Sequence, residues 1–485
     1  MKKLRATIVK NIAVNIARGG ATALSALVLL HFLTRTLEPA RFAAWSLMLQ
    51  IAAYASFLDF GLQLTVSRFV AQAIELEQSD RRDRIVESAF VLLSLAGAVA
   101  FAIIGGVIAG AAHFFHGIPA PLLGEFQIAA LILALAAALA LPLSAFSGAL
   151  FGMHRNEFPA YAFVGGCVTG VVLVILVAQR THSLIALACC VAVPALIGGL
   201  VQIPMAAHHM PSLRRIKMRV DRALGEELLR YSGTLAIWNV GMLIVTGLDL
   251  TVVAHFQFAA VGFYAVGATV IAMMAGANSA VINAFLTPQA ALHARGEKVR
   301  LSALLQKTTR ANSLVNFSLV LLAVLAGYPS LHLWVGEPYA TRALPVLIIL
   351  AAAQAIRLAG APYSVMLIST GEQSKGILGG VLETVVNLAA SLWLAHSMGY
   401  VGVAWGTLIG AVAGIVALVL YTVPRVQQVP FSNWRLVESG FLRPALCLLP
   451  LAAFALAHVR NAVGLESIWL AASLLATVCI SHFLG

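Results

Sequence analysis

Long apolar runs dominate this sequence of 485 residues and restrict the folds that it can adopt. Fourteen runs have about 18–25 residues each, the length that an α-helix needs to cross the hydrocarbon core of a bilayer. Hydrophobic residues make up 61% of the chain, charged residues only 10%, and the mean hydropathy is +0.93. These values exclude a soluble globular domain. The sequence therefore predicts an all-α, polytopic membrane protein with about 14 transmembrane helices.

The predicted spans follow one another at short intervals. They cover residues 11–35, 42–67, 87–112, 124–150, 159–180, 184–207, 231–255, 259–287, 312–333, 342–369, 376–397, 402–423, 441–459 and 467–484. The first run follows a basic N-terminus, as the apolar part of a signal peptide also does. It is long enough to span the bilayer, so we interpret it as an uncleaved first helix.

Lysine and arginine residues are distributed very unequally over the two sides of this topology. With the N-terminus inside, 24 of the 31 basic residues fall in cytoplasmic segments and five fall outside. The remaining two, Arg18 and Arg357, lie within spans. This asymmetry follows the positive-inside rule, so both termini are predicted to be cytoplasmic. We interpret the net charge of +12 as a result of topology and expect no nucleic-acid partner.

The connections between the spans divide into short external loops and longer cytoplasmic segments. The longest external loop covers about residues 113–124, which leaves no room for a folded domain outside. Two cytoplasmic segments, "RRIKMRVDRALGEELLR" and "RGEKVRLSALLQKTTR", mix apolar with basic residues. We expect them to lie as interfacial helices along the anionic inner surface of the membrane.

An internal repeat relates the two halves of the chain. "RFAAWSLM" from Arg41 and "VGFYAVGA" from Val261 each open a span and are 220 residues apart, while Gly152 and Gly371, at cytoplasmic turns, are 219 apart. A near-constant offset indicates a duplicated six-helix unit, and an even helix number gives both copies the same orientation. We expect two parallel-repeat six-helix bundles around a central cavity, followed by two more helices. The predicted domains are 1–215, 216–430 and 431–485.

The first span carries an unusual stripe of polar residues, Asn11, Asn15, Arg18, Thr22 and Ser25. Their steps of three and four place them on one face of a helix. Lipid would reject this face, so we expect it to contact protein or a water-filled cavity. In the alternative, Arg18 extends to the inner headgroups while the amides and hydroxyls hold neighbouring helices together.

Polar residues also share a face in four other spans. They are Ser56, Asp59, Gln63 and Ser67 in the second; Ser232, Asn239, Thr246 and Asp249 in the seventh; Gln354, Arg357 and Ser364 in the tenth; and Glu383, Asn387 and Ser391 in the eleventh. One arginine in each half suits an anion held between the bundles, because guanidinium matches phosphate oxygens. Asp59, Asp249 and Glu383 are either structural counter-ions or carriers of a coupling proton or Na⁺. For Asp59, an ion pair with Arg35 or Arg41 is a further alternative.

Other residue patterns indicate packing and no chemistry. Gly402, Gly406, Gly410 and Gly414 recur every four residues and predict a smooth ridge for close helix packing. The five cysteines lie in apolar runs without a CxxC pair, so we expect small core residues and no metal site. No motif of a hydrolase or a nucleotide-binding protein occurs, and we expect neither a cofactor nor enzymatic activity.

Three stretches resemble a known family. "LTRTLEPARFAAWSLMLQIAAYASFLDFGLQLTVSRFVAQ" is similar to the opening of the polysaccharide-transport flippases, which move lipid-linked O-antigen, capsule or exopolysaccharide units. "GLDLTVVAHFQFAAVGFYAVGATV" resembles the opening of that family's second half, and "LISTGEQSKGILGGVLETVVNLAASLWLAHSMGYVGVAWGTLIG" resembles its later part. The resemblance extends from about residue 10 to 425, and its motifs are shared across the MATE-like MOP superfamily.

This resemblance implies a bilobed bundle that opens alternately to each side, with a cationic cavity for a polyprenyl-pyrophosphate-linked oligosaccharide. The residues that we expect to bind this substrate are Arg18, Arg357, Asn15, Thr22, Asn239, Gln354 and Asn387. The candidates for ion coupling are Asp59, Asp249 and Glu383, with H⁺, Na⁺ or the membrane potential as the driving force. We expect a monomer in the bacterial cytoplasmic (inner) membrane, with membrane lipids, a glycan polymerase and other export machinery as partners.

Three alternatives to this function stay open. A lipid II flippase would have the same number of spans, with the last two helices forming a groove for the lipid tail. A multidrug exporter of the same superfamily would be ion-coupled, although Arg18 and Arg357 would repel cationic drugs. A membrane glycan polymerase or ligase needs acceptor chemistry on the outer face, for which the short external loops offer little room.

Overall fold

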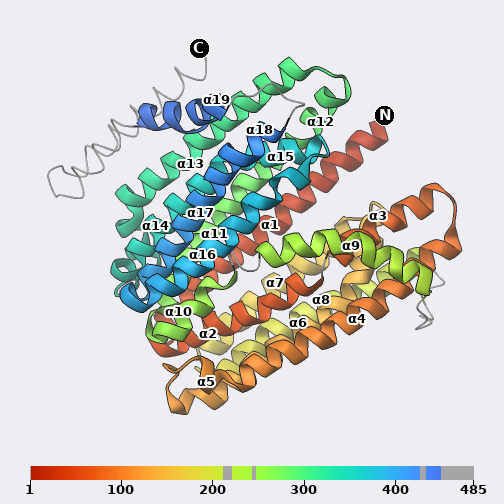
Figure 1. Cartoon of the computed structure of the whole chain (residues 1–485). Coiled ribbons are helices and arrows are strands. Elements are labelled where there is room, and N and C mark those ends of the chain that lie inside the picture. Colours follow the sequence, from red (N-terminus) through yellow and green to blue (C-terminus); the bar gives the residue numbers. More distant parts are fainter. Residues whose placement is uncertain are drawn as a thin grey trace. The chain divides into compact units, whose positions relative to one another are not determined.

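The computed structural model describes residues 2–59, 61–210, 221–242, 247–283, 285–426 and 433–448. In these ranges every regular element is helical and no strand occurs. The chain divides into two compact units, Met1–Gly262 and Phe263–Gly485. Figure 1 shows the helices of both units, coloured along the sequence.

The first unit consists of helices from the red to the yellow-green part of Figure 1. Its elements are α1 Lys2–Thr36, α2 Pro39–Ala53, η1 Tyr54–Asp59, α3 Leu62–Glu75, α4 Ser79–Ala109, α5 Ala111–Phe114, α6 Ala120–Gly152, α7 Glu157–Ala178, α8 Leu184–His209, α9 Arg222–Met242, α10 Asp249–Gln257 and η4 Phe258–Ala260. Helix α6 contacts α2, α3, α4 and α8, while α7 packs on α8 and α1. Fully buried side chains, among them Val70, Leu93, Phe146 and Leu228, join α3, α4, α6 and α9 in one core.

Glycines allow α3 and α6 to approach closely. A Cβ atom at Gly148 would lie 2.7 Å from the carbonyl oxygen of Gln63, and one at Gly152 would lie 2.7 Å from that of Ser67. Small residues permit such backbone contact between membrane helices. The close approach brings Val66 and Val70 of α3 against the same face of α6.

The predicted seventh span packs on the first unit. Helix α9 contacts α3, α4 and η1, and α10 and η4 contact α2. The compact units therefore divide after Gly262, whereas the repeat predicts a domain boundary near residue 215. The third predicted domain, 431–485, lies mostly outside the described residues.

The second unit contains the green to blue helices of Figure 1. Its elements are α11 Val261–Asn283, α12 Leu286–Ala294, α13 Lys298–Val335, α14 Tyr339–Ala359, α15 Ala361–Ser369, η5 Gln373–Gly376, α16 Ile377–Met398, α17 Tyr400–Ala417, η6 Leu418–Thr422, α18 Val423–Arg425, α19 Asn433–Val437 and η7 Glu438–Leu442. Helix α14 packs between α13 and α17, and α16 lies along α17. A buried cluster that includes Leu305, Tyr363, Met366 and Leu418 holds α13, α15 and the end of the α17 segment together.

One expectation about the cytoplasmic segments is wrong. The stretch "RGEKVRLSALLQKTTR" was expected to lie along the membrane surface, but from Lys298 it belongs to α13, a continuous helix of 38 residues. Leu301 and Leu305 of this stretch are buried in the protein core, so protein rather than lipid covers its apolar face. The other such segment starts among residues 211–220, outside the described part.

Ten helical segments of the described residues are long and apolar enough to cross a membrane. They correspond to ten of the 14 predicted spans and confirm the all-α polytopic fold. The first span lies on α1, whose side chains are described only from Arg18 onward. Residues 243–246 interrupt the description of the seventh span, and the last two spans lie largely beyond residue 448. The exact number of 14 stays a prediction.

Candidate functional site

Arg18 lies on α1 with its guanidinium over an aromatic ring of α7. Its Cζ atom is 4.7 Å from the centroid of the Phe163 ring. Cys167, one helical turn further along α7, is close enough to interact electrostatically. In the part of the chain that the structure describes, Arg18 forms no ion pair. A cation–π contact contributes about 0.5–2 kcal/mol, less than the roughly 2.5–3.5 kcal/mol cost of an arginine at the bilayer centre.

The two residues that follow Arg18 on α1, Gly19 and Gly20, are exposed. A Cβ atom at Gly19 or Gly20 would meet no atom within 4 Å. Thr22, one turn above Arg18, is exposed and donates its hydroxyl to the Arg18 carbonyl at 3.1 Å. The side chain of Asn15 lies outside the described part. Arg18, which is partly exposed, and the exposed Thr22 therefore lie on the same side of the helix.

Asp59 and Asp249 lie at ends of helical elements in two predicted spans. The second span changes from α2 to η1 and then to α3, and Asp59 ends η1. Its carboxylate accepts a 2.7 Å hydrogen bond from the backbone N–H of Gly61, whose φ of 73° favours glycine. Asp249 stands in the first turn of α10, which belongs to the seventh predicted span. A carboxylate at a helix N-terminus is also stabilised by the helix dipole.

Two side chains that are not among the predicted site residues connect the second predicted span to the seventh. The Tyr54 hydroxyl donates to the carbonyl oxygen of Gly247 at 2.7 Å, and Gln50 Nε2 donates to the same oxygen at 3.1 Å. Tyr54 also shares a hydrogen bond with the Thr251 hydroxyl. These bonds supply side-chain donors to a backbone carbonyl within a predicted membrane span. In both "DFG" and "GLD" a glycine stands two residues from an acid, and this pattern was the available sequence signal for the two sites.

Arg41 was expected as one alternative partner of Asp59. Its guanidinium forms an ion pair with Glu125 of α6 at 2.7 Å and donates to the carbonyl of His182 at 2.9 Å. Glu125 in turn accepts from the backbone N–H of Leu184 at 2.6 Å. Arg41 therefore ties α2 to the ends of α6 and α8.

The structure brings three of the predicted site residues together in the second unit. Arg357 Nε donates to Glu383 Oε1 at 2.5 Å, and Arg357 Nη1 donates to Gln354 Oε1 at 2.9 Å. The side chains of Arg357 and Glu383 are 21% and 15% exposed. The remaining nitrogen of the guanidinium, Nη2, is buried without a hydrogen-bond partner. The charge of Arg357 is thus neutralised by an internal carboxylate, while its Nη2 nitrogen keeps its N–H groups unused among the described residues.

The predicted glycine ridge on α17 is confirmed, and it covers the polar face of α16. A Cβ atom at Gly410 would lie 2.6 Å from Asn387 Cβ, and one at Gly414 would lie 2.8 Å from Glu383 Oε2. Asn387 is 1% exposed and accepts a 3.0 Å hydrogen bond from Ser391. In this structure Asn387 therefore contacts α17, and Glu383 lies where the covered stripe meets Arg357.

A break in the tenth span lies directly after Arg357. Helix α14 ends at Ala359 and α15 begins at Ala361. Asn312 of α13 donates its Nδ2 to the Leu358 carbonyl at 2.5 Å. Asn312 lies at the start of a predicted span and is not among the predicted site residues. The "GAP" sequence of residues 360–362 was the signal for the break.

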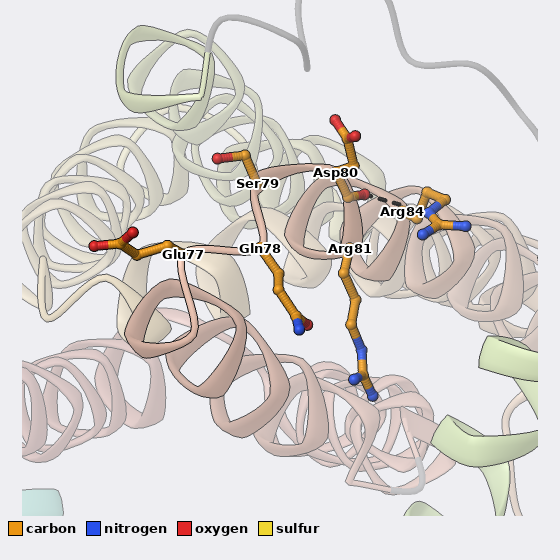
Figure 2. Close-up of a pocket in the computed structure, with 6 residues that line it drawn as sticks. All are labelled: Glu77, Gln78, Ser79, Asp80, Arg81 and Arg84. Carbon is orange, nitrogen blue, oxygen red and sulfur yellow. Dashed lines mark hydrogen bonds between the residues drawn. The ribbon is translucent and has the colours of Figure 1, made fainter.

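A surface hollow of about 490 Å³ lies at the turn between α3 and α4. Its lining consists of Glu77, Gln78, Ser79, Asp80, Arg81 and Arg84, shown in Figure 2. Arg81 and Arg84 pair with Glu227 and Asp221 beside α9. None of the predicted site residues lines this hollow, so it belongs to the packing of α9 rather than to a transport site.

The structure describes Asn239 and the five cysteines only in part. The side chain of Asn239, on α9, lies outside it. Cys167, Cys189, Cys190 and Cys447 are free thiols, and Cys479 lies beyond residue 448. Among the residues that were searched, no group of His, Cys, Asp and Glu side chains could hold a metal ion.

Solved structures with the same fold are transporters. An inward-facing multidrug resistance MATE family transporter of the MOP superfamily aligns with a TM-score of 0.70 and 16% identity, covering 90% of this chain and 96% of that one. The lipid II flippase MurJ aligns with a TM-score of 0.72 and 10% identity, covering 98% and 99%. A MOP superfamily transporter from Pyrococcus furiosus aligns with a TM-score of 0.59 and 17% identity, covering 92% and 96%. A search of curated proteins finds no match.

The sequence itself matches a family model. The model describes polysaccharide biosynthesis proteins and matches residues 8–289, more than half of the chain. The matched part includes Arg18, the hydrogen bond between Tyr54 and Gly247, and the start of the second unit. The MATE and MurJ neighbours agree with this assignment, because they have the transporter fold of the MOP superfamily. The chain belongs to the polysaccharide biosynthesis protein family, a multi-pass membrane protein with the fold of MOP-superfamily transporters and flippases.

Proposed function

We propose that the protein is a flippase that moves polyprenyl-pyrophosphate-linked oligosaccharide units from the cytoplasmic to the outer leaflet by alternating access. The observation that carries this proposal is the state of Arg18. It is a cation on a membrane helix, one turn from the exposed Thr22, with an aromatic ring as its contact and no ion pair among the described residues. A pyrophosphate offers the oxygens that guanidinium binds best.

Arg18 acts as the primary anchor for the anionic headgroup. Its guanidinium lies over the Phe163 ring, and binding need not first break an ion pair with any of the described residues. Thr22 adds a hydroxyl on the same side of α1. Asn15 and Asn239 are proposed to contact the sugars, since amides hydrogen-bond to hydroxyl groups.

Arg357 acts as a second anion site whose availability is regulated. The Glu383 carboxylate occupies its Nε, and Gln354 occupies its Nη1. A proton taken up by Glu383 removes the competing charge and releases the guanidinium for a phosphate oxygen. Glu383 is therefore the strongest candidate for coupling to H⁺, while the hydrogen bond of Asp59 to the Gly61 N–H and the place of Asp249 in the first turn of α10 favour structural roles for those acids.

The membrane potential supplies a driving force for this transport. Moving one elementary charge across the membrane corresponds to about 2.3 kcal/mol per 100 mV. The free energy of a pyrophosphate headgroup with two negative charges therefore falls when the headgroup moves out of an inside-negative cell. We propose that the protein works as a monomer in the inner membrane, with both termini cytoplasmic, and delivers its cargo to a glycan polymerase.

Lipid II is a second candidate substrate, because the likeness to the flippase MurJ covers nearly the whole of both chains. The test uses purified protein in liposomes that contain either a pyrophosphate-linked oligosaccharide unit or lipid II, with a membrane-impermeant glycosidase outside. We expect the protein to expose the oligosaccharide unit from the inner leaflet without changing its length. Exposure of lipid II alone would assign the second substrate. Elongated glycan chains, or no exposure of either lipid, would contradict flippase activity.

A further inference from the structure

The bend after Arg357 has a chemical cause in the sequence. In a regular helix the carbonyl of Leu358 would accept from the backbone N–H four residues later, which is residue 362. That residue is a proline and has no N–H. The backbone instead tightens, with Gly360 N–H donating to the Arg357 carbonyl at 3.2 Å. The Leu358 carbonyl thus lacks the regular bond from residue 362, and the Gly360 N–H that points toward it is shared with the Arg357 carbonyl.

Asn312 of the neighbouring helix α13 supplies the donor that Pro362 lacks. Its Nδ2 donates to the Leu358 carbonyl at 2.5 Å, and its side chain is buried, with 6% exposed. An open carbonyl in a membrane span has no water to bond, so a donor from another helix is needed there. Asn312 therefore fixes the backbone of the residue that follows Arg357.

The orientation of the Asn312 amide is itself fixed. Asn316, 2% exposed and one turn along α13, donates its Nδ2 to Asn312 Oδ1 at 3.1 Å and to the Asn312 carbonyl at 2.7 Å. It also lies 3.3 Å from Oδ1 of Asn278 on α11. With its oxygen held by Asn316, the Asn312 amide presents its nitrogen to Leu358. Three asparagines thus connect α11 and α13 to the bend in the tenth span.

We propose that Asn312 is a positioning residue for Arg357. Asn312 bonds to the backbone at the bend, while Gln354 and Glu383 bond to the Arg357 guanidinium. Together they determine where the guanidinium meets an anionic headgroup. The inference rests on the proposed function, because it assigns Asn312 a part in binding that headgroup. An asparagine that only joined helices would have no effect on Arg357 beyond stability.

The first test separates positioning from packing. Asn312→Leu removes the donor at similar volume, and Pro362→Ala returns an N–H to the Leu358 carbonyl and straightens the helix. We expect Asn312→Leu to lower the thermal midpoint and to raise the half-saturating concentration of lipid-linked substrate about tenfold. Adding Pro362→Ala is expected to restore the midpoint but not the half-saturating concentration. Recovery of both quantities in the double variant would show that Asn312 serves only the open carbonyl.

Two further variants act as matched controls. Ser313 is the buried neighbour of Asn312, and its hydroxyl has no hydrogen-bond partner among the described residues. Ser313→Ala should therefore leave the thermal midpoint and the half-saturating concentration unchanged. Asn312→Gln keeps an amide donor and should recover part of the affinity that Asn312→Leu loses. An unchanged half-saturating concentration in Asn312→Leu would overturn the proposal.

A readout without transport keeps this inference separate from the proposed function. The five native cysteines are replaced by alanine and Arg357→Cys is introduced, so that a charged thiol reagent reports the position of residue 357. We expect the labelling rate to change severalfold when Asn312→Leu is added and to stay constant with Ser313→Ala. A constant rate with Asn312→Leu would contradict positioning, whether or not the protein moves glycans. A changed rate together with absent flipping would contradict only the flippase.

Discussion

Arg18 and Arg357 are the two intramembrane arginines predicted from the sequence, and the structure gives them opposite environments. Arg18, in the first unit, lies over the Phe163 ring and has no ion pair within the described residues. Arg357, in the second unit, is bound by Glu383 and Gln354. The same side chain can thus be an available cation in one bundle and a neutralised one in the other. The comparison teaches that the packing around an intramembrane arginine decides whether its charge is available.

Removing the partner of Arg357 is expected to have the largest effect on stability. Glu383→Ala leaves a largely buried guanidinium without its carboxylate, which costs about 3–5 kcal/mol. The thermal midpoint of the purified protein in detergent measures this loss. The matched control replaces both partners, Arg357→Leu with Glu383→Leu, and should recover most of it. An equal loss in both proteins would show that the ion pair is not the cause.

The next largest effect is expected on the glycine ridge that covers Glu383 and Asn387. Gly410→Ala places a Cβ atom 2.6 Å from Asn387 Cβ, so α16 and α17 must separate. Such overpacking costs about 1–3 kcal/mol. Gly380→Ala on α16 is the control, because a Cβ atom there meets nothing within 4 Å. If the two substitutions lower the thermal midpoint equally, the packing role of Gly410 is refuted.

A smaller effect is expected at Arg18. Phe163→Leu removes the ring under the guanidinium, and the lost cation–π contact corresponds to about 0.5–2 kcal/mol. The stability loss should therefore be below that of Glu383→Ala, while the affinity for the anionic substrate falls because Arg18 is less well oriented. Phe163→Tyr retains a ring and should behave like the native protein. A loss in Phe163→Leu as large as that in Glu383→Ala would break the contrast between the two arginines.

The smallest effect concerns Glu337, a carboxylate between two spans of the second unit. Hydrogen bonds, first from Thr341 at 2.6 Å and then from Tyr328 at 3.0 Å, lower the pKa of Glu337 below its usual 4.5. A lowered pKa gives stability above the unfolded-state value that is lost as the pH falls through the folded-state value. Thr341→Val should weaken this stabilisation, seen as a slightly lower thermal midpoint near neutral pH and a smaller loss on acidification.

The Glu337 measurement also sharpens the comparison of the two arginines. Because its titration lies below pH 4.5, Glu337 cannot account for a pH dependence of transport near neutrality. A pH dependence in that range that disappears in Glu383→Gln would assign the proton to Glu383. A dependence that persists in Glu383→Gln would remove Glu383 as the coupling group.

Apolar run length sufficed to predict most helices, because the bilayer fixes the length of a span. The four-residue spacing of Gly402 to Gly414 likewise predicted a close helix contact, which the structure confirms. The proximity of Gln354 and Arg357 follows from their helical spacing. Their ion-pair partner does not, because Glu383 lies on another helix and only packing decides which faces meet. Asn312 was not singled out because its role depends on a proline 50 residues away.

The most direct test of this account compares Arg18 with Arg357 in reconstituted flipping. The rate at which a pyrophosphate-linked oligosaccharide unit reaches the outer face is measured for Arg18→Ala, Arg357→Ala and the control Arg180→Ala, an exposed arginine at the end of α7. We predict a loss of about 100-fold for Arg18→Ala, since it removes a charged hydrogen-bonding anchor. The loss should be smaller for Arg357→Ala and absent for Arg180→Ala. A native rate in Arg18→Ala at equal protein level would contradict the central claim that Arg18 anchors the substrate anion.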